Sequence, residues 1–237
     1  MSLLALETSS RTATVAWISD GAVVCIDGPS LGAAGESQTP ATGQHARGLA
    51  LQVRALLSAV GARPNDCRAV AVSSGPGSFT GLRVGITFAK TWAYALGIPL
   101  IEVSTFDVLA AQVPLALCRA EVRLDVIAEA QRGDLFVQSF SRVPDFWQAG
   151  DEIRIVSGTA WRGSLSPEVV VQGPGLDVHE GQSSAATFVS PEFRQPHAAT
   201  VARLGERKFH EGQFADLFAF EPRYIRRSAA EEKAANR

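Results

Sequence analysis

The chain has 237 residues, of which 46% are hydrophobic and 19% are charged, and its formal net charge is −2. This composition excludes a disordered chain and supplies a sizeable core. The slightly negative charge argues against a general nucleic-acid binder, which needs a strong basic balance.

The first part of the chain predicts an ordered series of strands and helices. Three strands joined by tight turns are expected over residues 3–8, 12–19 and 22–26. A loop rich in glycine, serine and proline follows over residues 28–43. The next elements are a helix over 45–60, a strand over 68–73, a helix over 81–96 and a strand over 99–103. Three strands followed by helix, strand, helix and strand is an RNase H-like order.

A similar but poorer series follows in the second part. It predicts strands over residues 122–128, 135–141, 152–156 and 169–172, and a helix over 198–209. The fold class is therefore α/β. We expect domains at residues 1–104 and 105–227, and a flexible tail over 228–237.

The cysteines and the N-terminus indicate a cytoplasmic protein. Cys25, Cys67 and Cys118 are widely spaced and form no C-x-x-C pair, so reduced thiols are expected instead of a zinc knuckle or a disulfide framework. Glu7 interrupts the apolar N-terminus and no basic segment precedes it, so no signal peptide is expected. No stretch reaches the length of a membrane span.

A glycine-rich turn joins the strand over 68–73 to the helix that follows it. Such a turn suits anions, because backbone N–H groups are free at a helix N-terminus. It is no P-loop, because no lysine follows Gly81, and no dinucleotide loop, because Thr80 stands at the third glycine position. Phe79 stands where a nucleophile elbow needs serine. The residues leave two interpretations open: a turn in which Thr80 caps the helix, or a loop that binds a ligand or partner.

The two helices of the first part carry more apolar surface than one sheet needs. The helix over 45–60 has a stripe of core-facing residues and, beside it, a second stripe that includes small residues. The helix over 81–96 is apolar around more than half its circumference. Either the helices pack within their own domain, or they form an exposed pair that docks on another protein. In the second interpretation the interface residues are Gly48, Leu51, Gln52, Ala55, Ala59, Ile86, Lys90 and Ala93.

Candidate catalytic residues are sparse. No two of the four histidines are four residues apart, so the pattern predicts no metal centre, and His45 is interpreted as a surface or interface residue. Glu7 ends the first strand beside Thr8 and Ser9, where it either accepts hydrogen bonds from the turn or belongs to a vestigial phosphate hairpin. The basic cluster near the C-terminus is interpreted either as a solvated end or as a contact for a nucleic-acid backbone, and it consists of Arg223, Arg226 and Arg227.

Residues 73–90, SSGPGSFTGLRVGITFAK, resemble the central signature of the TsaB family. The signature loop of this chain comprises Gly75, Pro76, Gly77, Ser78, Phe79, Thr80, Gly81 and Arg83. The opening LLALETSSRTATVAWISDG and the segment IAEAQRGDLFVQSF are similar to further family segments, although Glu7, Glu129 and Gln131 depart from the usual residues. The resemblance spans nearly the whole chain.

The resemblance implies a fold of two actin-like or Hsp70-like lobes, each RNase H-like, with the second lobe reduced. It implies a non-catalytic subunit that pairs with a TsaD-like paralogue, joins a TsaE-like ATPase, and self-associates when alone. The complex would form N6-threonylcarbamoyladenosine at position 37 of tRNAs reading ANN codons, and would bring this chain into contact with tRNA. No cofactor is expected in the chain alone, although ATP or ADP could sit at the partner interface.

Two other functions remain open. One is a stand-alone actin-fold phosphotransferase using ATP and Mg²⁺, which requires a complete nucleotide cleft. The other is a metallopeptidase. The catalytic relative carries an H-x-x-x-H metal site, whereas here His45 is followed four residues later by Leu49, which cannot bind a metal.

Overall fold

The computed structural model describes residues 1–30, 42–115, 122–179 and 186–225. The chain forms two compact units. The first contains Met1–Val108 and Pro196–Pro222, and the second contains Leu109–Gln195 together with the described residues 223–225. The predicted boundary after residue 104 lies close to the first crossing, but the assignment of residues 196–222 to the second domain is wrong, because they return to the first unit.

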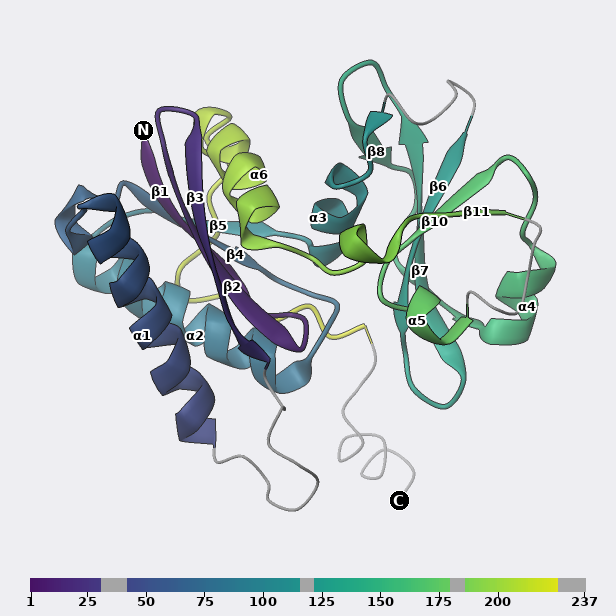
Figure 1. Cartoon of the computed structure of the whole chain (residues 1–237), viewed down its shortest axis with the longest axis horizontal. Coiled ribbons are helices and arrows are strands. Elements are labelled where there is room, and N and C mark those ends of the chain that lie inside the picture. Colours follow the sequence, from purple (N-terminus) through teal and green to yellow (C-terminus); the bar gives the residue numbers. More distant parts are fainter. Residues whose placement is uncertain (31–41, 116–121, 180–185, 226–237) are drawn as a thin grey trace. The chain divides into compact units, whose positions relative to one another are not determined.

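A mixed five-stranded sheet forms the centre of the first unit (Figure 1). Its order is β3-β2-β1-β4-β5, where β1 is Ser2–Glu7, β2 is Thr12–Ser19, β3 is Ala22–Ser30, β4 is Ala69–Ser73 and β5 is Leu100–Val103. The first three strands are antiparallel, and β4 and β5 continue the sheet parallel to β1. This is the RNase H-like order that the sequence predicts, with β3 four residues longer than expected.

Helices cover both faces of this sheet (Figure 1). On one face lie α1, Thr42–Val60, and α2, Phe79–Leu96, which share a core with alternate residues of the strands, among them Leu4, Leu6 and Val70. On the other face lies α6, Ala198–His210, against Leu3, Ala5 and Ala71. The alternation of side chains along a strand therefore supplies two cores from one sheet.

Small residues explain why α6 belongs to the first unit. The face of the sheet that it covers carries Ala5, Ala69 and Ala71, so the helix can approach closely. A Cβ built on Gly205 would lie 2.6 Å from the Cβ of Ala71, nearer than two carbon atoms can pack. Only glycine fits at this contact, which holds the helix against the sheet.

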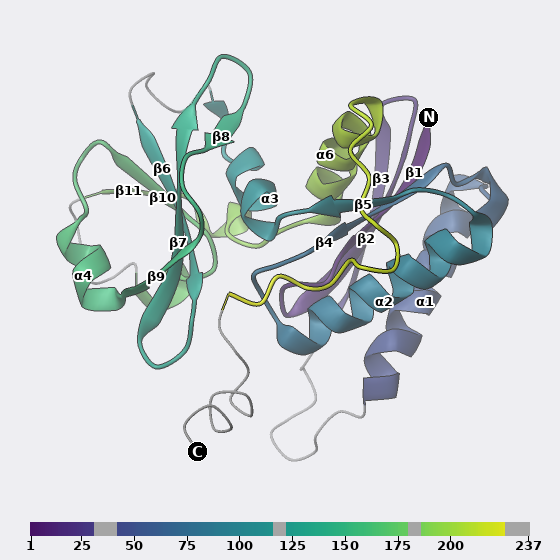
Figure 2. The same ribbon diagram turned by 180° about the vertical axis from the view of Figure 1, so that it is seen from behind.

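The segment after α6 also returns to the first unit (Figure 2). Its backbone meets β5, where Ala215 N–H donates to the Leu100 carbonyl at 2.9 Å. Ala215, Leu217 and Phe220 then pack against the core beneath α1 and α2, and Phe220 is only 7% exposed. The segment thus covers apolar surface of α2 that the local sequence leaves without a partner.

The second unit repeats the strand order with shorter helices. Its sheet has the order β11-β10-β6-β7-β8, where β6 is Arg123–Glu129, β7 is Asp134–Arg142, β8 is Trp147–Ala149, β10 is Val169–Gln172 and β11 is Thr187–Phe188. A further strand, β9 at Arg154–Ser157, also pairs with β7. The helices are α4, Gly158–Gly163, and α5, Leu176–His179, and Trp161 of α4 fills the core between them and the sheet. The sequence analysis missed β8, β11 and these two helices because each is too short to show a period.

Both units therefore have the RNase H-like strand order, and the second is reduced, as predicted. The chain therefore consists of two α/β units with the same strand order, which agrees with the predicted two-lobed fold. A short helix not expected from the sequence, α3 at Thr105–Ala111, spans the junction of the units. No helix in the described part of the chain combines the length and apolar character of a bilayer crossing.

Candidate functional site

The first hairpin turn buries a carboxylate. Glu7 ends β1 and is fully buried, and its Oε1 accepts hydrogen bonds of 2.5 Å from both the backbone N–H and the hydroxyl of Ser9. Burial raises the pKa of Glu7, and the hydrogen bonds from Ser9 and from Ser73 oppose that rise. Oε1 of this carboxylate thus holds the turn in shape.

The signature loop is anchored to this turn. It leaves β4 after Ser73 and enters α2 at Phe79, and the N–H of Ser78 donates to the carbonyl of Ser9 at 2.7 Å. Ser78 is the N-cap of α2, because its Oγ accepts from the N–H of Gly81 at 3.2 Å. The prediction that Thr80 caps the helix is therefore wrong, since the helix begins one residue before Thr80.

The glycines of the loop are required for packing. A Cβ on Gly77 would collide with the backbone of Ser9, and one on Gly81 would collide with the carbonyl of Thr8. A Cβ on Gly85, one helical turn further, would collide with the side chain of Thr8. These three glycines, one just before α2 and two on it, are spaced four residues apart and form a groove that receives the hairpin turn. This role needs no anion.

The tip of the loop lies at the surface. Gly77, Ser78 and Thr80 are exposed, and the ring of Phe79 is 42% exposed. The guanidinium of Arg83 lies 4.0 Å from the centre of that ring, which is a cation–π contact. Gly75 and Pro76, by contrast, are buried at the base of the loop. The signature thus has a buried structural half and an exposed half.

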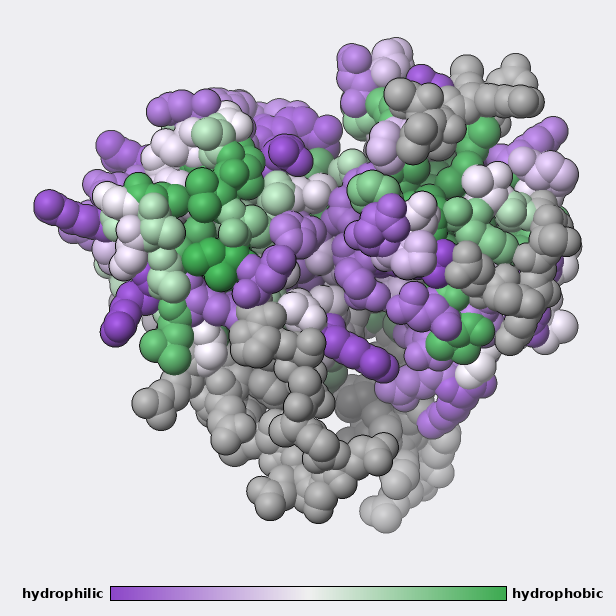
Figure 3. Space-filling view, viewed as in Figure 1, coloured by the Kyte–Doolittle hydropathy of each residue, from purple (hydrophilic) through white to green (hydrophobic). Residues whose placement is uncertain are grey.

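The second stripe of α1 is open to solvent. Leu51 is 53% exposed, Ala55 and Ala59 are exposed, and Gly48 and Gln52 are half-buried. The core-facing residues Leu49, Val53 and Leu56 lie on the opposite side of the helix. Ala50 is also exposed. Figure 3 shows hydrophobic surface over β3 beside α1, where Val24 is 43% exposed.

The interface residues predicted on α2 need correction. Ile86 is 3% exposed and Ala93 is 1% exposed, so both belong to the core of the first unit. Lys90 binds the segment from Ala215 to Phe220, which we call the returning segment, because its Nζ donates to the carbonyls of Phe218 and Phe220 at 3.1 and 3.0 Å. The wide apolar arc of α2 is therefore used within the unit, and we define the α1 face as Gly48, Leu51, Ala55 and Ala59.

Other predicted residues are only partly placed. Leu49, in the position where the catalytic relative has its second histidine, is 2% exposed in the core. The side chain of His45 lies outside the described residues, as do Arg226, Arg227, Cys118 and the predicted tail over 228–237. Arg223 is described but its two neighbours in the basic cluster are not, so the tRNA contact stays a prediction.

Comparison with known proteins gives full-length relatives. The chain is 26% identical to the tRNA threonylcarbamoyladenosine biosynthesis protein TsaB of Bacillus subtilis, over 98% of this chain and 97% of that protein. It is 26% identical to the Escherichia coli protein of the same description, over 98% of both chains. A family model for TsaD, tRNA N6-adenosine threonylcarbamoyltransferase, matches residues 38–144.

Two solved structures have the same fold. YeaZ from Pseudomonas aeruginosa superposes with a TM-score of 0.73 at 22% identity, over 94% of this chain and all of that one. A second Pseudomonas aeruginosa structure, described as an uncharacterized protein with similarity to peptidase YeaZ, gives a TM-score of 0.75 at 22% identity, over 95% of this chain and 99% of that one.

Proposed function

Because this chain belongs to the TsaB family, we propose that it is a non-catalytic subunit of the machinery that forms N6-threonylcarbamoyladenosine at position 37 of tRNAs reading ANN codons. Its partner is a TsaD-like transferase, and a TsaE-like ATPase joins the complex in the cytoplasm. Any ATP or ADP sits at the partner interface, and tRNA binds the assembled complex.

The observation that carries the proposal is the α1 face. Leu51, Ala55 and Ala59 are exposed on a helix whose other side is already buried in its own core. Small residues let a partner helix approach closely, and each Å² of apolar surface removed from water contributes roughly 25 cal/mol. This face therefore suits a helix of the paralogue, or of a second copy when the paralogue is absent.

The hairpin and loop support a non-catalytic role. Oε1 of Glu7 accepts from Ser9, the N–H of Ser78 donates to the carbonyl of Ser9, and the N–H of Gly81 donates to Oγ of Ser78. A phosphate hairpin needs such groups to be available to the nucleotide. Here they hold the fold, which disfavours the stand-alone phosphotransferase.

The test is the substitution Ala55→Glu. A carboxylate on the α1 face should weaken binding of the TsaD-like paralogue from the same genome by about 2–4 kcal/mol, because the charge is buried without a partner. Isothermal titration calorimetry measures this loss, and modification of tRNA by the reconstituted complex should fall with it.

Ala50→Glu is the matched control. Ala50 is also exposed on α1 and lies about 140° around the helix from Ala55. It should bind the paralogue like the wild type, and circular dichroism should report folded protein for both variants. Equal binding by the wild type and a folded Ala55→Glu variant would refute the interface, and ATP turnover by the pure chain would favour the phosphotransferase.

A further inference from the structure

Three potential metal ligands meet at the start of α6. Nε2 of His197 lies 2.9 Å from Oδ1 of Asp27, and Sγ of Cys25 lies 3.9 Å from the same nitrogen and 3.7 Å from Nδ1. One ligand atom from each residue lies within 4.8 Å of the other two. The cluster brings together a soft thiol, an imidazole and a carboxylate.

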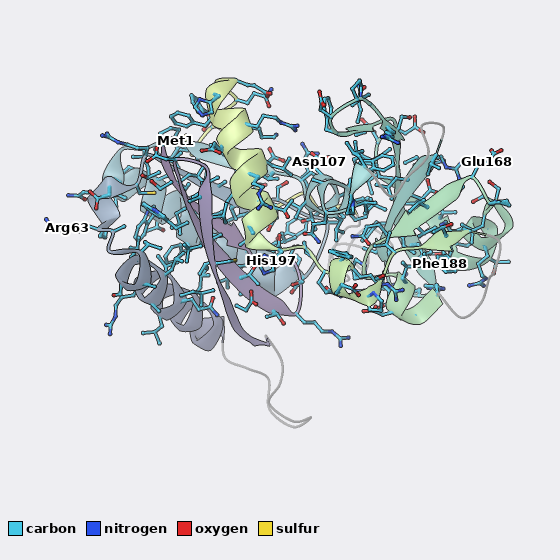
Figure 4. All side chains as sticks on the ribbon, turned by 45° about the horizontal axis from the view of Figure 1, so that its top comes forward. Met1, Arg63, Asp107, Glu168, Phe188 and His197 are labelled. Atoms are coloured by element: carbon cyan, nitrogen blue, oxygen red, sulfur yellow. The ribbon has the colours of Figure 1, made fainter. Side chains whose placement is uncertain are left out.

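The fold itself holds the cluster together. Cys25 and Asp27 are two residues apart on β3, so both point to the side of the sheet that α6 covers. His197 is the N-cap of α6, and the next residue, Ala198, donates its N–H to Oγ1 of Thr14 at 2.8 Å. Thr14 lies opposite Asp27 in the β2–β3 pairing, so the start of α6 is fixed beside the two strand residues. Figure 4 shows His197 at this end of α6.

Two of the three ligand separations are close to those of a tetrahedral zinc site, and the third is within 4.8 Å. With Zn–S near 2.3 Å and Zn–N and Zn–O near 2.0–2.1 Å, ligand atoms at tetrahedral angles lie about 3.6 Å apart for S and N and about 3.3 Å for N and O. The observed separations of 3.9 and 2.9 Å differ from these by only a few tenths of an ångström. The side chains of His197 and Asp27 are 39% and 69% exposed, so an ion can enter from solvent.

We propose that Cys25, Asp27 and His197 form a Zn²⁺ site that joins β3 to the start of α6 and leaves one coordination position for water. Binding displaces the thiol proton of Cys25 into solvent. The ion also takes the place of the proton on Nε2 of His197. That proton moves to Nδ1, so the ring stays neutral and Nδ1 ceases to accept from the N–H of Ala199. The bond from Ala198 to Thr14 remains and keeps the helix start in place.

The same three residues could instead serve as a nucleophilic triad. Burial, together with the charge of Asp27, raises the pKa of Cys25 to about 11. A thiol activated for attack has a lowered pKa and a partly exposed, electropositive setting. The case for ligation therefore rests on geometry, since one ligand atom from each of the three residues lies within 4.8 Å of the other two.

The test uses the metal alone. The purified full chain, stripped with chelator, should bind one Zn²⁺ per chain in calorimetry. Co²⁺ in its place should give the thiolate-to-cobalt charge-transfer band and the intense visible bands of a tetrahedral site. Cys25→Ser and His197→Asn should each weaken Zn²⁺ binding at least tenfold and remove the charge-transfer or tetrahedral signature. Asparagine at position 197 keeps a good N-cap, so loss of the helix cap is not the cause.

Cys67→Ala and Cys118→Ala are the matched controls, and both should keep the metal and its spectrum. A second readout is thermal unfolding, because Zn²⁺ should raise the midpoint of the wild type and leave that of His197→Asn unchanged. Absence of stoichiometric binding by the folded wild type would overturn the proposal. So would unchanged affinity in Cys25→Ser and His197→Asn, or loss of the cobalt band only in the control variants.

Discussion

The two units use the same sheet but different helices. In the first unit β4 lies parallel to β1, and in the second β10 lies parallel to β6. Each of these two strands is followed by a Gly-Pro-Gly turn, at Gly75–Gly77 after β4 and at Gly173–Gly175 after β10. The first glycine has nearly the same left-handed backbone in both, with φ of +113° and +115°. The helix that follows has 18 residues in the first unit and 4 in the second. The repeat therefore survives in the sheet and its turns, whereas the surfaces that helices can offer to a partner belong to the first unit.

The hairpin turns also differ between the units, because the β1–β2 turn is packed against a long helix and the β6–β7 turn is not. Glu7 ends β1 and is buried, whereas Glu129 ends β6 at the corresponding place and is exposed. The turn after Glu129 has Gln131 and Arg132 at φ of 65° and 57°, so it turns through left-handed backbone. In the first unit the turn packs into the glycine groove of α2, a helix that has no long counterpart in the second. A buried turn thus accompanies a long helix.

The largest expected effect is in the returning segment, where alanine substitutions at Phe220 and at Phe218 should differ strongly in their cost to stability. Phe220→Ala removes a ring that is 7% exposed in the core beneath α1 and α2, so unfolding free energy should fall by about 3–5 kcal/mol. Phe218→Ala, two residues away at a ring that is 79% exposed, should cost less than about 1 kcal/mol. Urea unfolding measures both. Equal losses would mean that the segment does not complete the core of the first unit.

The third position of the two Gly-Pro-Gly turns tests the comparison directly. Gly77→Ala forces a Cβ into the backbone of Ser9, so it should cost about 2–3 kcal/mol. At Gly175 the closest atom is a side-chain carbon of Ile127 at 3.0 Å, which can shift, so Gly175→Ala should cost about 1 kcal/mol. Denaturant midpoints of the two variants give the order, and a larger loss at Gly175 would contradict the groove on α2.

Local pattern predicts the sheet well. Alternating and β-branched residues gave β2 and β10 with their observed bounds, and the strand order of both units follows from the series of elements. Three consecutive strands before the first helix suffice to indicate the RNase H-like order.

What the sequence analysis missed depends on residues far apart in the chain. Ile86 and Ala93 belong to one buried core with residues of β1, β4 and α1 and with Phe220, which lies more than a hundred positions later in the chain. Cys25 and His197 are 172 positions apart and meet only because α6 covers the face of β3. The N-cap was predicted at Thr80 because the helix was expected over 81–96, whereas α2 begins at Phe79 and Ser78 caps it. No local period carries such information.

The buried carboxylate should make stability depend on pH. The folded-state pKa of Glu7 is raised above its ordinary value of 4.5, so the native state binds the proton more tightly than the unfolded chain does. This contribution to stability is complete below pH 4.5 and is lost as pH rises through the folded pKa. Glu7→Gln mimics the protonated form and keeps an oxygen to accept from Ser9. The variant should therefore match the wild type in acid and be the more stable protein above that window.

Urea unfolding of both proteins across pH gives the difference curve. Glu129→Gln makes the same change of charge at the exposed strand end of the second unit and serves as the matched control. A difference between Glu7→Gln and the wild type that grows toward acid would have the wrong sign and would contradict a raised pKa at Glu7.

The smallest expected effect separates helix stability from pairing on the α1 face. A Cβ on Gly48 meets nothing within 4 Å, and the residue lies inside α1, so Gly48→Ala should stabilise the isolated chain by about 0.5–1 kcal/mol through helix propensity. Gly163 also has open space but ends α4, so Gly163→Ala should change stability by a few tenths of a kcal/mol, about what a helix end allows. If a helix of the paralogue approaches closely at Gly48, the methyl group of Gly48→Ala should weaken binding of the paralogue while it stabilises the isolated chain. Thermal unfolding and calorimetry with the paralogue measure the two effects separately. If Gly48→Ala both stabilised the chain and strengthened its binding to the paralogue, Gly48 would not be the point of close helix contact.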